Sequence, residues 1–525
     1  MLLRRKYLLV LLLPSIFLHH AVFAQSPSQI HQQADSIPNV QPAAQPLFKA
    51  TTRAVVLDVV VEDGRKHPVH GLTRNDFVLT ENAQAQEIAS FDAVGLTSNV
   101  SRDVSSLPHT ILLIDEMNTR FLDLAYARYA TEKLLSASKQ LDDPTALLAL
   151  TNQGLLVLQN YTQDPNQLRT ALQHHRPSFP WRLSQGIDGA GERITISFRG
   201  LQSIAIANQG SGRHNNLIWI SPGFPVLIKA GISSGRQKKL FDEIRDLSDE
   251  LLRARMTIYT VDPRGVDMGQ SSHYGSGVWV GNQLAPVPKE KQVAFSDLAL
   301  SALSSQTGGR SFYGHEDVDA QIASSITEGE NYYTVSYYPS NHNFDGSFRK
   351  IKVSLATPGL TARTRDGYYA LPAPAPPTEK ETATTLMQAL LNPLNFGSIP
   401  VHLAKVSLSG TAPQGEFGIA VEGKALQWNA SANGSVQCNL DIAAADFEAN
   451  GKAIHLVSQP FLFVLRSTPE DAQKRVVELS LKLAVDRPAH RVRILVHDRA
   501  TGYMGSMDIT SFQPSRSPSQ GIPNF

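Results

Sequence analysis

The stretch Ile111-Leu112-Leu113-Ile114-Asp115-Glu116-Met117-Asn118-Thr119 decides the fold of this chain. Four consecutive aliphatic residues run into an acid and then into short polar residues, and a long helical pattern follows. A continuous apolar run of this kind is typical of a strand buried on both faces of a sheet. In open α/β sheets, ligands bind just beyond the carboxyl ends of such strands. Asp115 therefore occupies a position where a functional side chain is expected.

Strand and helix patterns alternate from about residue 108, which predicts a mostly parallel sheet. The predicted strands include 144–150, 216–221 and 256–261, and the predicted helices are 123–139, 237–255, 295–305 and one opened by Asp164-Pro165. The run 154–158 follows its neighbour after a short turn, which indicates an antiparallel hairpin at the sheet edge. Strands at 331–338 and 349–353 are expected to complete the sheet.

Composition limits the function classes. The net charge of the 525-residue chain is +1, so no electrostatic argument favours binding to nucleic acid. Cys438 is the only cysteine, which excludes a disulfide within the chain and cysteine-based zinc sites. Because Cys438 lies in an alternating stretch, we expect a buried strand thiol.

The N-terminus has the features of a secretory signal peptide. The basic residues Arg4, Arg5 and Lys6 precede a short apolar run, and Val22-Phe23-Ala24 offers a small-residue cleavage site. We predict a secreted or periplasmic protein cleaved near Ala24. No later run reaches the roughly 18 apolar residues of a membrane helix, so no transmembrane segment is expected after cleavage.

The predicted layout has seven parts. They are a signal peptide (1–24), a flexible tether (25–46), an N-terminal β unit (47–97), an α/β domain (106–370, with a long loop at 263–294), a proline-rich linker (371–383), a C-terminal β-sandwich (384–512) and a disordered tail (513–525). The α/β domain is the part in which a functional site is expected, because only there do polar residues follow buried parallel strands.

Several short motifs carry a family resemblance. They are the Asp115 strand, Val59-Val60-Val61, Gly71-Leu72-Thr73, Asp76-Phe77, Thr307-Gly308-Gly309-Arg310, Asn331-Tyr332-Tyr333, Tyr337-Tyr338-Pro339, Arg349-Lys350-Ile351-Lys352-Val353 and Arg365-Asp366-Gly367-Tyr368-Tyr369. Over about residues 48–370 the chain resembles acidobacterial proteins related to the von Willebrand factor A domain. The resemblance implies a Rossmann-like, doubly wound and mostly parallel sheet, flanked by the N-terminal β unit and the C-terminal β-sandwich.

The resemblance also implies a place for a metal-ion-dependent adhesion site. The family uses an Asp-x-Ser-x-Ser loop, a threonine from a second loop and an aspartate from a third loop to hold Mg²⁺. Asp115 and Thr119 match two of these positions, but Met117, a poor ligand for Mg²⁺, stands where the first serine belongs. The third loop reads Ser221-Pro222-Gly223, and Thr195 is only a loose candidate for the second loop.

The sequence therefore predicts a degenerate site at which Mg²⁺ is possible but a metal-free loop is favoured, with no other cofactor. In the metal-free alternative, Asp115 and Thr119 cap the following helix. The loop rim of Asp115, Asn118, Thr119 and Ser221 is the predicted binding surface for a protein ligand in the cell envelope or outside the cell.

We expect a non-enzymatic protein-interaction or adhesion module, and two alternatives stay open. One is an envelope hydrolase with an acid-based site, for which Asp115 beside Asp262 in an open pocket would argue. The other is a purely structural envelope assembly protein. The adjacent His174 and His175 point to different sides of a helix and are not expected to share a metal. The spacing Gly231-Ile232-Ser233-Ser234-Gly235 resembles a nucleophile elbow but is better explained as a loop.

Overall fold

The structure is a computed structural model that describes residues 54–94, 107–177, 186–223, 234–264, 300–313, 317–408, 414–431, 434–485 and 490–510. The predicted signal peptide, tether and tail, most of the long loop and Ser233 lie outside these ranges. No helix in the described ranges is both long enough and apolar enough to cross a membrane.

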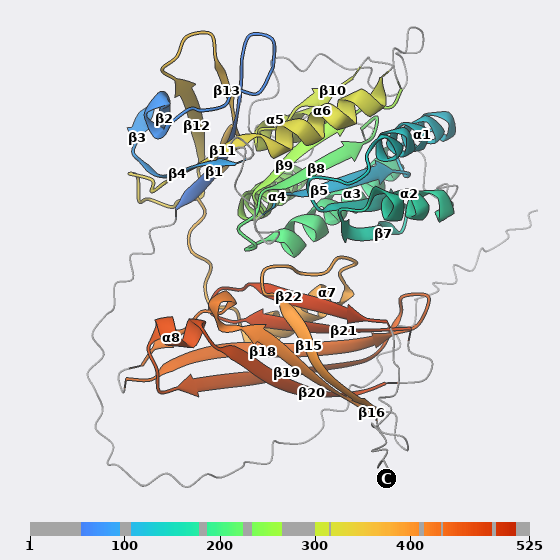
Figure 1. The fold of residues 1–525 in the computed structure, drawn as a ribbon, viewed down its shortest axis with the longest axis vertical. Coiled ribbons are helices and arrows are strands. Elements are labelled where there is room, and N and C mark those ends of the chain that lie inside the picture. Colours follow the sequence, from blue (N-terminus) through green and yellow to red (C-terminus); the bar gives the residue numbers. More distant parts are fainter. Residues whose placement is uncertain are drawn as a thin grey trace, which may run out of the picture. The chain divides into compact units, whose positions relative to one another are not determined.

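The α/β domain is built on a six-stranded sheet (Figure 1). Its strands are β5 (His109–Asp115), β6 (Thr145–Thr151), β7 (Gly154–Thr162), β8 (Asn215–Ile220), β9 (Met256–Val261) and β10 (Ser311–Phe312). The order is β10-β9-β8-β5-β6-β7, and only β7 runs antiparallel to its neighbour. The chain winds outward from β5 to one edge and then returns to β8 to build the other half. This is the doubly wound order, and its direction reverses between β5 and β8.

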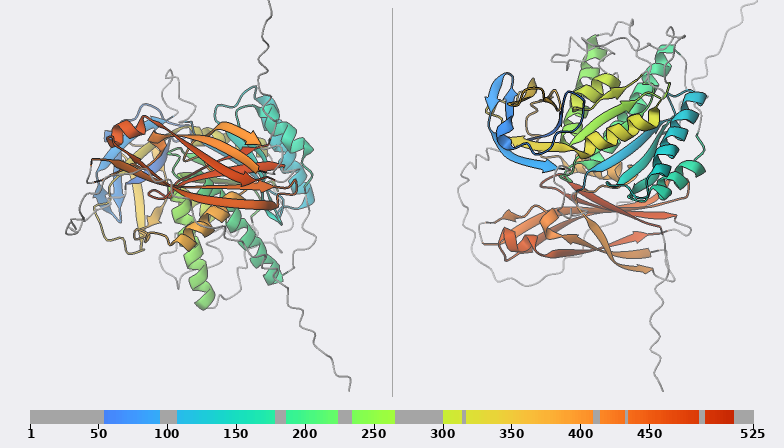
Figure 2. Two further views of the ribbon diagram at one scale, coloured as in Figure 1. Left: turned by 90° about the horizontal axis from the view of Figure 1, so that it is seen from below. Right: turned by 45° about the horizontal axis from the view of Figure 1, so that its top comes forward.

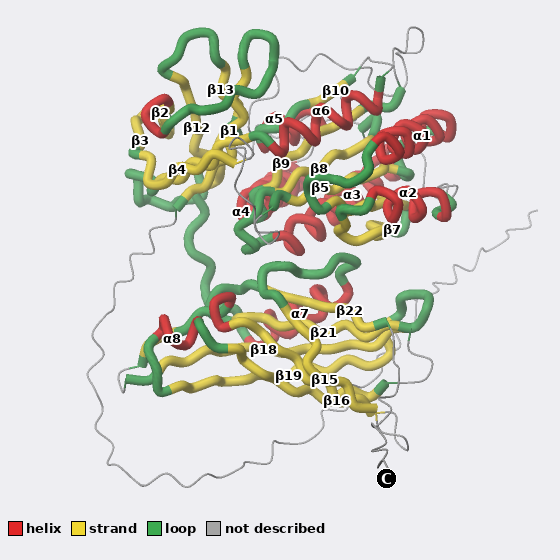
Figure 3. Tube along the Cα trace, in the orientation of Figure 1, coloured by secondary structure: helices red, strands yellow, loops and turns green. Residues whose placement is uncertain are grey.

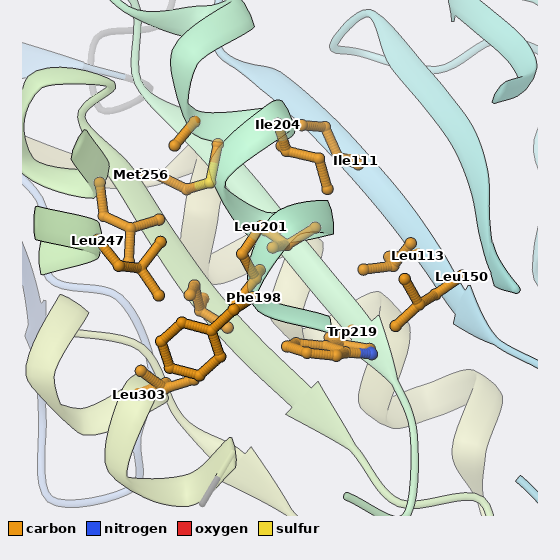
Figure 4. Close-up of a cluster of buried hydrophobic side chains, with 14 of the residues drawn as sticks. Ile111, Leu113, Leu150, Phe198, Leu201, Ile204, Trp219, Leu247, Met256 and Leu303 are labelled. Atoms are coloured by element: carbon orange, nitrogen blue, oxygen red, sulfur yellow. The ribbon is translucent and has the colours of Figure 1, made fainter. Parts of the chain in front are cut away.

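Helices cover both faces of this sheet, as two views show (Figure 2). One layer contains α1 (Phe121–Ala137), α2 (Pro165–His174) and α6 (Val318–Glu330), and the other contains α3 (Gly186–Asn208), α4 (Ser234–Arg253) and α5 (Leu300–Thr307). Successive strand residues point to opposite layers, so the whole apolar run of β5 is buried. Phe198, Trp219 and Leu303 meet in the second layer (Figure 4).

Two local predictions in this domain are confirmed. Asp164 is the N-cap of α2, where its side chain accepts a hydrogen bond from the Asn166 N–H, and Pro165 occupies the first turn. Strand β7 forms the predicted antiparallel hairpin with β6.

A second part consists of two four-stranded antiparallel sheets around one core (Figure 3). The first sheet has the order β13-β1-β11-β4 and the second β14-β12-β2-β3. The strands are β1 (Val55–Glu62), β2 (Phe77–Glu81), β3 (Gln84–Gln86), β4 (Ile88–Val94), β11 (Tyr332–Tyr337), β12 (Phe348–Leu355), β13 (Thr361–Arg363) and β14 (Gly367–Tyr369). A short 3-10 turn, η1 (Arg74–Asp76), precedes β2.

The prediction that 331–338 and 349–353 complete the parallel sheet is wrong. Strand β11 pairs with β1 and β4, and β12 pairs with β2 and β14. The rings of Phe77, Phe91 and Tyr333 lie 5.2–5.6 Å apart. They connect strands that precede the parallel sheet in the sequence with a strand that follows it. The sixth place in the parallel sheet belongs to β10, whose two residues are too few to give a sequence pattern.

The C-terminal part contains two antiparallel sheets that share a core. One sheet is β15 (Val401–Leu408), β16 (Gln414–Glu422) and β20 (Val476–Ala484). The other is β17 (Asn429–Ala430), β18 (Val436–Phe447), β19 (Ala453–Leu465), β21 (Arg491–Asp498) and β22 (Met504–Ile509). Helix α7 (Glu379–Leu391) packs on the outer face of the second sheet; η5 (Gly423–Ala425) and α8 (Pro469–Gln473) are short. Cys438 is buried on β18, as predicted, and burial raises the pKa of its thiol to about 12.

Candidate functional site

Asp115 and Ser221 meet at the point where the strand order reverses. Asp115 is the last residue of β5, and Ser221 follows β8, its parallel neighbour on the other half of the sheet. The Ser221 hydroxyl donates a hydrogen bond of 2.7 Å to Oδ2 of Asp115. This bond connects the two loops that border the crevice position of a doubly wound sheet.

The Asp115 carboxylate is surrounded by donors. Its Oδ1 accepts from the backbone N–H groups of Met117 (3.1 Å) and Asn118 (2.9 Å), and its Oδ2 accepts from Nδ2 of Asn118 (2.9 Å) as well as from Ser221. The side chain is 0% exposed. Burial raises the pKa of Asp115, while the hydrogen bonds from Asn118 and Ser221 act in the opposite direction. The carboxylate therefore organises a tight turn at the end of β5.

The helix-capping alternative for this loop is wrong. Helix α1 begins at Phe121, and its N-cap is Arg120, which makes no side-chain capping bond. The N–H groups that Asp115 binds belong to the turn before the helix. Thr119 is buried, and within the described residues its Oγ1 has no hydrogen-bond partner.

The remaining family positions are not assembled around Asp115. Met117 is buried in the same hydrophobic core as Leu150 and Trp219, so its side chain anchors the loop to that core. Thr195 lies exposed on α3 and donates to the Gly191 carbonyl of its own helix at 2.9 Å.

The donor set does not fit Mg²⁺ in this arrangement. Both oxygens of the Asp115 carboxylate already accept two hydrogen bonds each, and a metal would have to displace them. Besides these, Oδ1 of Asn118 and Oγ1 of Thr119 are the buried oxygens without a hydrogen bond in this loop. Two neutral oxygens fall short of the octahedral oxygen shell that Mg²⁺ demands. Within the described ranges, no three His, Cys, Asp or Glu side chains group closely enough to hold a metal ion.

A third loop joins the other two. Asp262 directly follows β9 and forms an ion pair of 2.5 Å with Arg264, whose Nη2 also lies 3.5 Å from the Pro222 carbonyl oxygen. The pairing with Asp262 and, to a smaller extent, the charge of Asp123 raise the pKa of Arg264. We refer to the loops 116–120, 221–223 and 262–264, together with the first turn of α1, as the rim.

The rim exposes apolar side chains. Phe121 is 64% exposed and Leu122 is 76% exposed at the start of α1. Beside them, Arg120 and Asp123 form an ion pair with an Nε–Oδ2 distance of 2.7 Å. The charges next to the two apolar side chains are thus balanced within the rim.

A buried acid–histidine pair supports the rim and was missed by sequence reasoning. Glu116 is buried, and its Oε1 lies 2.6 Å from Nε2 of His175 at the end of α2. Arg128 on α1 donates to the His175 carbonyl at 2.9 Å. His174 instead contacts the Thr170 carbonyl of its own helix, so the two histidines have separate partners. No local pattern links Glu116 to His175, because 59 residues separate them.

Comparisons with known proteins place few constraints on this chain. No protein-family model and no curated protein matches it. Among solved structures, the Rpn10 VWA domain ("SpRpn10") matches with 14% identity over 30% of this chain and 75% of its own, at a TM-score of 0.18. The N-terminal domain of TFIIH p34 matches with 14% identity over 42% and 98%, at a TM-score of 0.23. Manganese-loaded TRAP protein of Plasmodium vivax matches with 8% identity over 66% and 91%, at a TM-score of 0.25.

These likenesses are too distant to transfer a function. The class of the domain rests on its own architecture, which is a mixed α/β domain with a mostly parallel, doubly wound sheet. The rim lies at the carboxyl edge of that sheet.

Proposed function

We propose that this protein is a secreted, non-enzymatic interaction module that binds a protein partner through the rim, without a metal ion. The observation that carries this proposal is the hydrogen bond between Ser221 and the buried Asp115 carboxylate, which holds two rim loops together. The predicted signal peptide supports a partner in the cell envelope or outside the cell.

The chemistry of the rim favours a partner with an apolar patch. Phe121 and Leu122 present large apolar side chains to solvent, while Arg120 and Asp123 beside them neutralise each other. Binding energy in protein interfaces concentrates in a few such apolar and arginine residues at the centre of a patch. Because the loops beneath are already fixed by internal hydrogen bonds, little conformational entropy is lost on binding.

The same contacts support the proposed metal independence. In a metal-dependent adhesion site, a divalent cation balances the aspartate charge and offers open positions to an acidic ligand. Here the N–H groups of Met117 and Asn118 and the Ser221 hydroxyl donate to Asp115 in place of a cation. Recognition would then depend on the shape and apolar surface of the rim.

These contacts favour binding over the hydrolase alternative. Acid-based hydrolysis needs a carboxyl group that reaches its substrate, often with a second acid close by. Asp115 is fully buried, and Asp262 is bound by Arg264. A purely structural role in envelope assembly stays as the second outcome of the test below.

The test is capture of envelope and secreted proteins with the full chain as bait. Leu122→Asp places a charge in the exposed patch, and Tyr338→Asp, at a side chain that is 54% exposed outside the rim, is the matched control. We expect the same partner with Mg²⁺ or with EDTA, and a loss of about tenfold or more in retention by Leu122→Asp alone. Release by EDTA would refute metal independence. Equal retention by Leu122→Asp and the parent would refute the rim as the binding surface and favour the structural role.

A further inference from the structure

Strand β19 is a long edge strand. It spans Ala453–Leu465 and pairs with β18 on one side, and within the described residues no strand pairs with its other side. Leu462 is 61% exposed and Val464 is 55% exposed. Unpaired edges of this kind present a row of backbone donors and acceptors to other chains.

The orientation of the free backbone groups follows from the strand pairing. The Asn439 carbonyl accepts from the Arg499 N–H at 3.0 Å, so Asn439 directs its backbone polar groups away from β19. Because these directions alternate along a strand, Leu440 directs its groups to Phe461, its partner on β19. The N–H and C=O groups of Leu462 and Val464 therefore point outward from the free edge.

The edge carries none of the features that usually block strand addition over its last five residues. Phe461-Leu462-Phe463-Val464-Leu465 is wholly apolar and contains no charge, proline or glycine. Other edge strands of this part are charged, with Lys405 on β15, Glu478 and Lys482 on β20 and Asp508 on β22. Lysine and other charges are common protections of exposed edges. The absence of such charges from 461–465 indicates that this edge is suited to pairing with another strand.

We propose that β19 is a dimerisation edge, in which Phe461–Leu465 pairs antiparallel with the same segment of a second copy of this chain around a two-fold axis at Phe463. In this register Leu462 lies opposite Val464 of the second copy, and Val464 lies opposite its Leu462. Each of these pairs exchanges two backbone hydrogen bonds, which gives roughly four at the centre of the interface. The exposed aliphatic side chains then form cross-strand pairs on one face.

Three further features are compatible with a second copy as the occupant. Pro460 has no N–H to donate, and this register places it opposite Arg466, outside the central ladder. The two Arg466 residues lie on opposite sides of the axis, about 20 Å apart along the strands, so they do not repel each other strongly. The net charge of +1 adds little repulsion between whole chains. The segment can therefore pair with itself through its outward backbone groups, without strong charge repulsion.

The test is the mass of the full chain by light scattering after size exclusion, at concentrations up to about 100 µM because dimerisation follows mass action. We expect twice the chain mass for the parent and a single chain mass for Leu462→Lys and Val464→Lys. Val476→Lys, at an exposed position on β20, is the matched control and should stay dimeric. Circular dichroism confirms that each variant is folded.

Cross-linking tests the register independently of any loss of folding. Leu462→Cys mixed with Val464→Cys should form a mixed disulfide on oxidation, because directly opposite Cα atoms lie about 5.5 Å apart. Leu462→Cys mixed with Ser458→Cys should not. The native Cys438 is buried and does not compete. A monomeric parent, larger open assemblies, a dimer that survives Leu462→Lys, or equal cross-linking in both mixtures would each overturn the proposal.

Discussion

Replacing Asp115 by alanine tests whether this residue holds the rim together. The substitution removes the acceptor of four hydrogen bonds, from two backbone N–H groups, the Asn118 amide and the Ser221 hydroxyl. The Asn118 amide is only partly buried and can turn to water, whereas the Met117 N–H and Ser221 are buried. A buried donor left without a partner costs about 1–3 kcal/mol. We expect Asp115→Ala to lower the free energy of unfolding by about 3–4 kcal/mol, against about 1 kcal/mol for loss of a simple helix cap.

A double-mutant cycle isolates the contact between the loops. Ser221→Ala alone should cost about 1–2 kcal/mol, since it removes a hydrogen bond to a carboxylate. Because both residues share one bond, the double variant should be less destabilised than the sum of the two single variants by about 1 kcal/mol. Asp115→Asn keeps one acceptor oxygen and should lie between the parent and Asp115→Ala.

The assay combines urea unfolding of the full chain with amide hydrogen exchange. Exchange reports local opening, so peptides that cover the ends of β5 and β8 should lose protection together in Asp115→Ala. Peptides from β18 and β21 serve as the internal control. A cost near that of a helix cap, additive effects in the cycle, or lost protection confined to β5 would refute the reasoning.

Two further predictions concern the scaffold. Burial raises the pKa of Glu250 from 4.5 to about 7. Its contribution to stability is therefore fully present below pH 4.5 and is lost as the pH rises through about 7, by up to about 3 kcal/mol. Glu250→Gln should flatten the decline in urea midpoint between pH 5 and pH 8; an unchanged slope would contradict this. A Cβ at Gly309 would lie 1.9 Å from the Ile258 carbonyl oxygen, whereas one at Gly64 would meet nothing within 4 Å. We expect Gly309→Ala to lower the thermal midpoint sharply, by several degrees or more, and Gly64→Ala to leave it nearly unchanged; equal midpoints would show that the backbone relaxes.

The parallel core was predictable because its signal is local. Buried parallel strands are rich in apolar residues, and the runs 111–114 and 217–220 are apolar throughout, while 256–261 is buried with two threonines among its apolar residues. The position of Asp115 at the carboxyl edge followed from the end of such a run. Gly309 belongs to one of the motifs that carry the family resemblance, and its close packing on Ile258 supplies a physical reason for a glycine there.

Local sequence patterns could not predict which strands pair with each other or which residues meet at the site. Strand β11 pairs with β1 across 282 residues at Val55 and Tyr337, and neither sequence pattern encodes that choice. The bond from Ser221 to Asp115 joins residues 106 apart, and a serine before a Pro-Gly turn gives no sign of it. Such contacts depend on the order in which strands enter the sheet, which hydrophobic periodicity does not specify.

The residue at position 117 bears both on the proposed metal independence and on the order of the loop. The family resemblance places a metal-ligating serine at 117, but methionine there belongs to the hydrophobic core and ties the loop to Leu150 and Trp219. A cation would otherwise offset the cost of burying the Asp115 carboxylate. With Met117 turned inward, that role passes to hydrogen-bond donors, and Ser221, at the place of the family's third-loop aspartate, supplies one of them. Met117, a core side chain, and Ser221, a hydrogen-bond donor, stand where the family resemblance places oxygen ligands. We infer that a metal-mediated contact, which depends on the cation, is thereby replaced by permanent hydrogen bonds. A rim built in this way would be expected to bind its partner with an affinity that does not vary with divalent cation concentration.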